Sequence, residues 1–304
     1  MLSAALRFLL YDKPKSIGAL FGIVISIFLI GQQIGIYTFL TGLMAALPNS
    51  TRGKVGLWVV SNATQDANSL ALLDIRLQRE IESIPGVLRA YPFVVAAAQA
   101  RFENGETSPV TLVGAQYPEL KGGAWNISKG TIHDILPDGA FSCDEFDEKT
   151  LGGATLGTSF ELAGKRAYIA LQTRGARGFG APYMFTTLER ARAYGAVPTD
   201  KVSAILVDIE PNEDTLAVRD RINATIAGVR AWTAEDLSAS TIGFILSTSG
   251  IAISTGTLIV FAIISGLVII GLTLYSATID RIRDYVTLKA IGSTNGFITR
   301  LILT

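Results

Sequence analysis

Leu237–Ile279, LSASTIGFILSTSGIAISTGTLIVFAIISGLVIIGLTLYSATI, is a run of 43 residues without a charge. As one helix, at about 1.5 Å per residue, it would be roughly 64 Å long, about twice the thickness of a bilayer core. We therefore expect a membrane span centred on the apolar Leu258–Leu274 and a stalk over the serine- and threonine-rich Ser238–Thr257. Just before the run, Thr233–Asp236 matches the capping-box pattern that opens a helix.

A second uncharged run, Ser16–Thr51, lies near the N-terminus, and its core Ile17–Leu47 is almost wholly apolar. The core exceeds the roughly 7–15 apolar residues of a signal peptide and the about 20 residues that cross a bilayer. We expect an uncleaved transmembrane helix over residues 16–48. Gln32 and Gln33 are costly against lipid, so they predict hydrogen bonds to another helix or, as the less favoured alternative, a polar conduit.

The composition agrees with a membrane protein that has a sizeable part outside the bilayer. Of 304 residues, 49% are hydrophobic and 17% are charged, and the mean hydropathy is +0.40. Soluble domains carry about 25% charged residues. The formal net charge is zero and gives no electrostatic argument for nucleic acid binding. The single cysteine, Cys143, cannot form an intrachain disulfide, and we expect a buried, inert thiol.

Residues 49–236 between the two apolar runs are expected to form a domain outside the membrane. Val55–Val60, VGLWVV, predicts a strand, and Val87–Ala98 predicts a return strand after the Pro85-Gly86 break. Between these strands, apolar residues at helical spacing predict a helix with one apolar stripe: Leu70, Leu73, Leu77, Ile81 and Ile84.

The same pattern returns later in the chain. Ala204–Ile209 predicts a strand, Pro211–Ile226 a helix and Val229–Thr233 a return strand. The two units also end alike, with IPGV at Ile84–Val87 and IAGV at Ile226–Val229. Two such βαβ units predict a split βαβ, ferredoxin-like lobe, although the shared endings are short enough to arise by chance.

The glycine-rich residues between the units, about 116–198, predict an inserted β-rich lobe with short strands such as Ser159–Leu162 and Ala167–Leu171. The acidic Asp144–Glu148 within it could bind a hard cation but lacks the alternating ligands of a calcium loop, so a solvated loop is preferred. His133 beside Asp134 has no further metal ligand nearby in the sequence.

Enzyme motifs are absent from the sequence. There is no P-loop, because Gly164-Lys165 is followed by Arg166 rather than serine or threonine. There is no HExxH pair, and one histidine with one cysteine nearly excludes the usual nucleophile–base pairs. We expect a protein that is not an enzyme and draws any energy from a partner.

Asp280–Ile298, DRIRDYVTLKAIGSTNGFI, directly follows the long apolar run. A helix over Asp280–Ile291 would carry polar residues on one side and apolar residues on the other. Gly292 would end it, and Ser293 or Thr294 would cap a second helix near Asn295. These residues predict a docking element or, equally, an ordinary membrane-proximal anchor.

Lysine and arginine near the apolar runs predict the orientation. They are more frequent beside the termini than beside the central domain: Arg7, Lys13, Lys15, Arg281, Arg283, Lys289 and Arg300 against Arg52, Lys54 and a distant Arg230. Both termini are therefore expected in the cytoplasm. Residues 1–15 predict a short amphipathic helix on the membrane surface, ended by Pro14.

The segment Asp280-Arg281-x-Arg283-Asp284-Tyr-x-Thr-Leu288-Lys289-Ala290-Ile291-Gly292 resembles the one after the second membrane helix in FtsX-like permeases of ABC transporters, the MacB type. The layout is similar too. The resemblance implies an α+β membrane protein, with two transmembrane helices flanking a periplasmic domain that has a split βαβ lobe and an inserted β-rich lobe. YVTLKAIG is most similar to members of the DevC kind.

The resemblance also implies partners and a coupling role. Family members form homodimers or heterodimers of four-helix permeases in the bacterial inner membrane, docked on a cytoplasmic ABC ATPase, and many work with a periplasmic adaptor and an outer-membrane channel. No cofactor is implied. Residues 280–297 would form the coupling helix, and residues 298–304 would begin a third span, so we expect two further spans beyond Thr304. The residues that match the coupling motif are Arg281, Arg283, Asp284, Leu288, Lys289, Ala290, Ile291 and Gly292.

Two alternative functions remain. One is a mechanical signaller of the same family, whose outer domain activates a cell-envelope enzyme instead of exporting a substrate. The other is a two-span receptor, which would need a cytoplasmic coil with heptads after Ile279. The sequence there has a glycine break and a new apolar segment instead.

Overall fold

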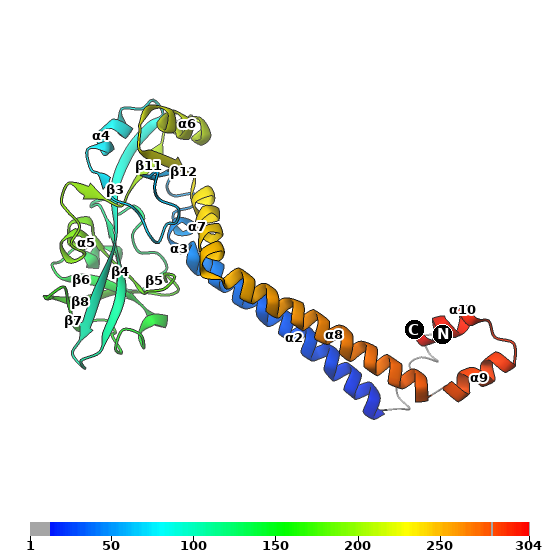
Figure 1. Cartoon of the computed structure of the whole chain (residues 1–304). Helices are drawn as coiled ribbons and strands as arrows, with labels where there is room; N and C mark the ends of the chain where they lie inside the picture. Colours follow the sequence, from blue (N-terminus) through cyan, green and yellow to red (C-terminus); the bar gives the residue numbers. More distant parts are fainter. Residues whose placement is uncertain (1–12, 281, 304) are drawn as a thin grey trace. The chain divides into compact units, whose positions relative to one another are not determined.

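The computed structural model describes residues 13–280 and 282–303, so the surface helix predicted for residues 1–15 lies largely outside the described part. The chain forms two compact units. We call them the helical unit, residues 1–39 and 250–304, and the sheet unit, residues 40–249. Figure 1 shows the elements of both units along the chain.

The helical unit contains long apolar helices. They are α2 (Lys13–Met44, whose last turn belongs to the sheet unit), α8 (Ile251–Asp280), α9 (Ile282–Ala290) and α10 (Asn295–Leu303). Leu20–Met44 and Ile251–Leu272 are long and apolar enough to cross a membrane. Large apolar side chains on both are exposed, as they would be against lipid: Phe21 is 65% and Leu267 66% exposed.

Within this unit α2 and α8 approach each other at a glycine. A Cβ atom at Gly22 would lie 2.2 Å from Cγ2 of Ile269, so only glycine allows this contact. Gln32, for which a helix partner is predicted, is exposed, and Gln33 is half-buried. The hydrogen-bonding role of these two residues therefore stays a prediction.

The uncharged stretch forms two helices, α7 (Ala234–Ser249) and α8, rather than one. Gly250 between them has a φ of +69°, a left-handed conformation that ends a helix and favours glycine. Just before it, Ser249 Oγ donates to the Ile245 carbonyl at 2.6 Å. Such hydroxyl bonds compete with the helix backbone. The residues expected to form a stalk thus lie largely in a helix that packs into the sheet unit, where Leu237 is 1% exposed.

The first lobe of the sheet unit has four antiparallel strands in the order β12-β1-β11-β3. Its elements are β1 (Leu57–Ser61), α4 (Leu77–Glu82), β3 (Val87–Phe102), β11 (Ala204–Ile209), α6 (Thr215–Thr225) and β12 (Val229–Trp232). Numbered by their position in the sequence, these strands lie side by side in the sheet as fourth, first, third and second. This is the split βαβ arrangement, and the predicted ferredoxin-like lobe is confirmed.

Two predicted helices are longer than the observed ones. The first begins at Leu77 instead of Leu70, because Leu73–Asp74 forms β2 and pairs with β10 (Lys201–Val202). The second begins at Thr215 instead of Pro211, because the Asp214 side chain accepts from the Leu216 N–H at 3.2 Å and caps it.

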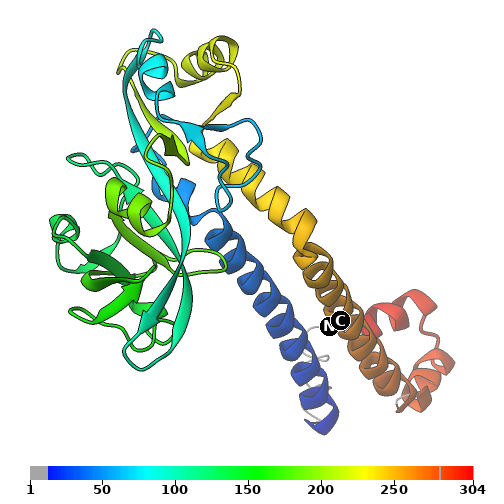
Figure 2. The ribbon, with the colours of Figure 1, turned by 60° about the vertical axis from the view of Figure 1, so that its left-hand side comes forward.

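The second lobe is β-rich, as predicted. It contains β4 (Thr107–Ala115), β5 (Ile127–Lys129), β6 (Ala140–Asp144), β7 (Ser159–Leu162), β8 (Lys165–Thr173), β9 (Tyr183–Thr187) and α5 (Leu188–Tyr194), with short 3₁₀ turns at Ile132–Ile135 and Glu145–Asp147. It extends beyond residues 116–198, because β3 is 16 residues long and runs through both lobes (Figure 2). The first half of β3 pairs with β11 and the second half with β4 and β7.

Each face of the sheet carries its own core, because neighbouring strand residues point to opposite sides. One core packs α4, α5 and α6 against the sheet. The other, which we call the base core, packs α3 (Ala46–Ser50) and α7 against both lobes. Members of the base core include Leu47, Trp58, Ala67, Tyr183, Phe185 and Leu237.

Candidate functional site

Helical segments that belong to the sheet unit pack together at a place that we call the base. It consists of the last turn of α2, α3 and α7. Ser238 of α7 donates to Asn49 of α3 at 2.8 Å, and Arg52 forms an ion pair with Glu235 at 2.8 Å. Beneath them, Trp58 Nε1 donates to Thr51 Oγ1 at 2.8 Å in a buried contact. The base therefore holds α3 and α7 against the sheet by both apolar burial and hydrogen bonds.

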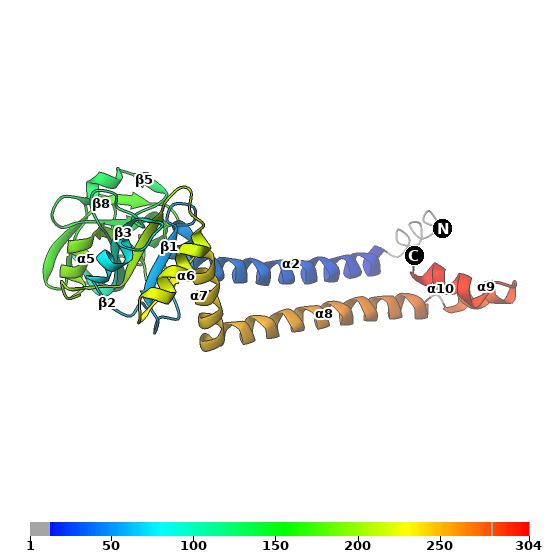
Figure 3. The ribbon, with the colours of Figure 1, turned by 90° about the horizontal axis from the view of Figure 1, so that it is seen from above.

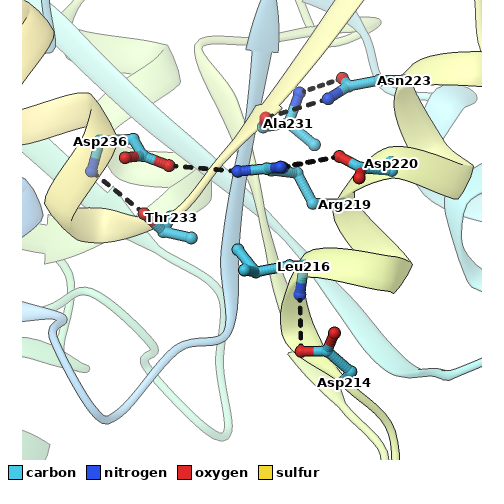
Figure 4. A network of polar contacts seen from close by, with 8 residues as sticks. All are labelled: Asp214, Leu216, Arg219, Asp220, Asn223, Ala231, Thr233 and Asp236. Atoms are coloured by element: carbon cyan, nitrogen blue, oxygen red, sulfur yellow. Dashed lines mark hydrogen bonds and ion pairs between the residues drawn. The ribbon is translucent and has the colours of Figure 1, made fainter.

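The start of α7 is also fixed to the first lobe. Thr233 Oγ1 accepts from the Asp236 N–H at 3.0 Å, which confirms the predicted cap at Thr233. Arg219 of α6 lies between Asp220, at 2.9 Å, and Asp236, at 3.4 Å (Figure 4). Exposed ion pairs of this kind contribute about 0–1 kcal/mol each, so they orient α7 more than they stabilise it.

A loop of residues 62–72, the base loop, completes the base. Its Ala67 N–H donates to Thr241 Oγ1 of α7 at 2.9 Å. Ser240 Oγ of α7 donates to the Gln65 carbonyl at 3.1 Å. Asn68 Nδ2 donates to the carbonyl of Met44, the last residue of α2, at 2.8 Å. The base loop thus touches both helices, a role that its ordinary polar sequence did not indicate.

The predicted coupling segment forms a helix, a glycine stop and a second helix, α9 and α10, after α8 (Figure 3). Gly292 has a φ of +104°. Its N–H donates to the Lys289 carbonyl at 3.0 Å, and the Ser293 N–H donates to the Leu288 carbonyl at 3.1 Å. These two bonds are the Schellman motif, so the glycine ends α9 as predicted.

Several apolar side chains of this segment are exposed. Ile282 is 56%, Val286 61% and Ile291 80% exposed. Ile282 and Val286 also line a groove of about 250 Å³ between α9 and α10, together with Lys289, Asn295, Ile298 and Thr299. Apolar patches that face water commonly mark surfaces that bind a partner or a membrane.

The structure places the predicted coupling residues as follows. Arg283, Asp284, Leu288, Lys289 and Ala290 lie in α9, Ile291 and Gly292 at its end, and Arg281 outside the described residues. Leu288 is half-buried, whereas Arg283 and Lys289 are exposed. Five of the predicted residues thus share one short helix.

The acidic residues of the second lobe have a structural role, which corrects the preference for a solvated loop. Asp144 is fully buried and accepts from Thr173 Oγ1 at 2.9 Å and from the Ala176 N–H at 2.7 Å. Asp147 is 3% exposed and forms an ion pair with Arg177 at 2.6 Å. These carboxylates hold the glycine-rich loop after β8.

The other chemically notable residues have no partners for catalysis in the described part of the chain. Cys143 is fully buried, and burial raises the pKa of its thiol to about 12, which agrees with an inert thiol. His133 is exposed. No group of three or more histidine, cysteine, aspartate or glutamate residues in the described ranges is placed to hold a metal ion.

The described residues form a two-lobed domain on one shared sheet, which lies in the chain between two helices long and apolar enough to cross a membrane. Residues 16–225 match the family model of the MacB-like periplasmic core domain, and the chain belongs to that family. This confirms the MacB-type resemblance, and the chain is an FtsX-like permease of the ABC transporter class with a periplasmic domain. Its similarity to DevC and the expected further spans stay predictions.

Solved structures of transporter domains also match parts of this chain. The periplasmic region of MacB from Actinobacillus actinomycetemcomitans is 9% identical, with a TM-score of 0.46, and the match covers 64% of this chain and 94% of that chain. The extracellular domain of the noncanonic ABC-type transporter YknZ from Gram-positive bacteria is 16% identical, with a TM-score of 0.40, over 58% of this chain and 97% of that chain. A search of curated proteins gave no match.

Proposed function

We propose that this chain couples ATP hydrolysis by a separate cytoplasmic ATPase to movement of its periplasmic domain, which exports or extrudes a substrate. The observation that carries the proposal is the base. There α3, which follows α2, and α7, which precedes α8, are held together by Ser238–Asn49 and Arg52–Glu235 contacts. In the proposal, a displacement of α2 reaches the domain through α3, and a displacement of α8 reaches it through Gly250 and α7.

The coupling surface in this proposal is α9 with its glycine stop. Its exposed apolar residues Val286 and Ile291 would enter the ATPase, and the exposed cations Arg283 and Lys289 would pair with carboxylates there. The proposal includes Arg281, Asp284, Leu288, Ala290 and Gly292 in the same surface. It requires that both termini lie in the cytoplasm.

The working assembly would be a homodimer or heterodimer in the bacterial inner membrane, in contact with lipid along α2 and α8. A periplasmic adaptor and an outer-membrane channel would receive the substrate. Catalysis belongs to the ATPase, and nucleic acid has no part in the mechanism.

The test is Ile291→Asp in the complete permease expressed with its ATPase. A carboxylate at this 80% exposed position should abolish ATPase co-purification and stimulated turnover, while membrane insertion is unchanged. The matched control is Leu216→Asp in α6, a 48% exposed leucine of the periplasmic domain, which should leave both intact. If Ile291→Asp has wild-type values for both, the docking proposal is wrong and α9 is a membrane-proximal anchor.

Orientation is tested with single cysteines, and the buried native Cys143 contributes little background. A cysteine at the exposed Glu103, in the turn after β3, should react with an impermeant reagent in intact spheroplasts, and one at the exposed Asn295 should not. The reverse labelling pattern would invert the proposed topology.

A further inference from the structure

Asn68 of the base loop contacts α2 and the second lobe at the same time. Its Nδ2 donates to the Met44 carbonyl at the end of α2, at 2.8 Å. Its Oδ1 accepts from the Tyr183 hydroxyl, at the start of β9, at 3.2 Å. Both ends of one amide group are thus used, one on a membrane helix and the other on the lobe farther along the sheet.

The surroundings hold this amide in place. The Asn68 N–H donates to Asp66 Oδ1 at 2.7 Å, which fixes the turn of the base loop. The neighbouring Ala67 is 1% exposed, and its N–H donates to Thr241 of α7. Asn68 is therefore hydrogen-bonded to the end of α2, and its neighbour Ala67 to α7.

Tyr183 is equally fixed on the side of the second lobe. It is 3% exposed, and its ring contacts Trp125 and Phe185 with centroids 6.2 Å and 6.1 Å away. Burial, with Asp66 nearby, raises the pKa of Tyr183, so the hydroxyl keeps its proton and remains a donor. The Tyr183 end of the contact is as firmly packed as the Asn68 end.

The two lobes are also linked through the sheet and through the base core. The long strand β3 passes from the first lobe to the second, and the base core contains residues of both lobes, such as Trp58 and Phe185. The Asn68 contact adds a direct path from helix to lobe.

We propose that Asn68 is a positioning residue that transmits displacement of the membrane helices to the second lobe through Tyr183. The inference rests on the proposed function, since it needs a displacement to transmit. It assigns to the base loop the role of setting the angle between the lobes.

The two halves of the link can be broken separately. Asn68→Asp removes the donor to the Met44 carbonyl but keeps an acceptor for Tyr183, whereas Tyr183→Phe removes only the hydroxyl donor. Because the two bonds act in series, either variant should lose transmission, and the double variant should be no worse than either one. Such non-additivity would not be expected from two independent losses of packing.

The chain offers matched controls. Asn223 also uses both ends of its amide, on the Ala231 carbonyl at 3.3 Å and the Ala231 N–H at 2.7 Å, but both partners lie within the first lobe. Tyr194 donates its hydroxyl to the Arg166 carbonyl at 3.1 Å, within the second lobe. Asn223→Asp and Tyr194→Phe therefore remove the same chemistry without crossing between the lobes.

The measurement uses the complete permease with its ATPase in nanodiscs, carrying spin labels at cysteines that replace the exposed Glu80 of the first lobe and Lys149 of the second. The label-to-label distance should change between nucleotide-free and ATP-trapped states in the wild type and both controls. The change should be lost in Asn68→Asp and in Tyr183→Phe, with ATPase co-purification unaltered.

Two results would overturn the inference. If Asn68→Asp and Tyr183→Phe keep the wild-type distance change, the link is not needed, although the proposed function stands. If the wild type shows no nucleotide-dependent change and no ATPase association, both the link and the proposed function are wrong.

Discussion

At the base, the apolar side chains next to the membrane helices are buried inside the protein. In the coupling segment, apolar side chains next to a membrane helix are exposed. Leu47 and Leu237 of the base are each 1% exposed. Val286 and Ile291 of the coupling segment are 61% and 80% exposed. Both regions adjoin a membrane-spanning helix, and both combine apolar residues with charges.

This difference in exposure suggests that the two regions have different roles. Burial stabilises by about 25 cal/mol per Å² of apolar surface, so the base gains its order from this chain alone. The exposed apolar residues of α9 can gain that energy only when something outside the described chain covers them. In our proposal the base transmits force within the molecule, and α9 receives it from a partner.

The largest expected effect is at the centre of the base. Trp58 is fully buried, contacts Phe93 with ring centroids 5.4 Å apart and donates to Thr51. Trp58→Ala should lower the free energy of unfolding of the sheet unit by about 3–5 kcal/mol, because it leaves a cavity and removes the hydrogen bond to Thr51 Oγ1. The loss of unfolding free energy is measured by urea unfolding of the full chain in detergent.

The matched substitution on the coupling segment is Ile291→Ala. Because Ile291 is 80% exposed, its loss should change the same unfolding free energy by less than about 0.5 kcal/mol. Comparable losses at Trp58 and Ile291 would contradict the contrast between a buried base and an uncovered coupling helix.

A smaller effect is expected where α7 begins. Thr233→Ala removes the side-chain acceptor of the Asp236 N–H and should cost about 1 kcal/mol of unfolding free energy. The control is Thr187→Ala at the start of α5, where the threonine makes no side-chain cap bond. Equal losses in the two variants would show that the Thr233 cap does not secure α7.

The sequence predicted those parts of the fold that depend on local pattern. The strand Ala204–Ile209 has the predicted bounds, since its apolar residues mark a strand buried on both faces. The helix stop at Gly292 was also predictable, because the left-handed conformation favours glycine. The split βαβ lobe followed from finding that pattern twice.

What the sequence did not reveal depends on contacts between distant residues. Leu73 fits a helical stripe, yet it pairs with Val202 in a two-stranded sheet. The sharing of β3 between the lobes depends on register, which no local pattern of Val87–Phe102 specifies. Asn68 lies in a polar loop, and its importance comes from the positions of Met44 and Tyr183.

The last expected effect is confined to the end of α9 and should not reach the sheet unit. Gly292 has a φ of +104°, so Gly292→Ala should destabilise the Schellman turn by roughly 1–2 kcal/mol without changing the unfolding of the sheet unit. Hydrogen exchange of the Gly292→Ala chain should therefore be roughly tenfold faster at the amides of residue 292 and Ser293, whose bonds to Lys289 and Leu288 close the turn.

Gly296→Ala is the control for that measurement. Gly296 lies within α10 and has no atom within 4 Å of a built Cβ, so alanine should stabilise its helix by roughly 0.5–1 kcal/mol and slow exchange there. Opposite signs at the two glycines would show that α9 needs its own ending to present Ile291. The same sign at both would mean that the exposed end of α9 is not defined by Gly292, and the coupling surface would then have to be ordered by its partner.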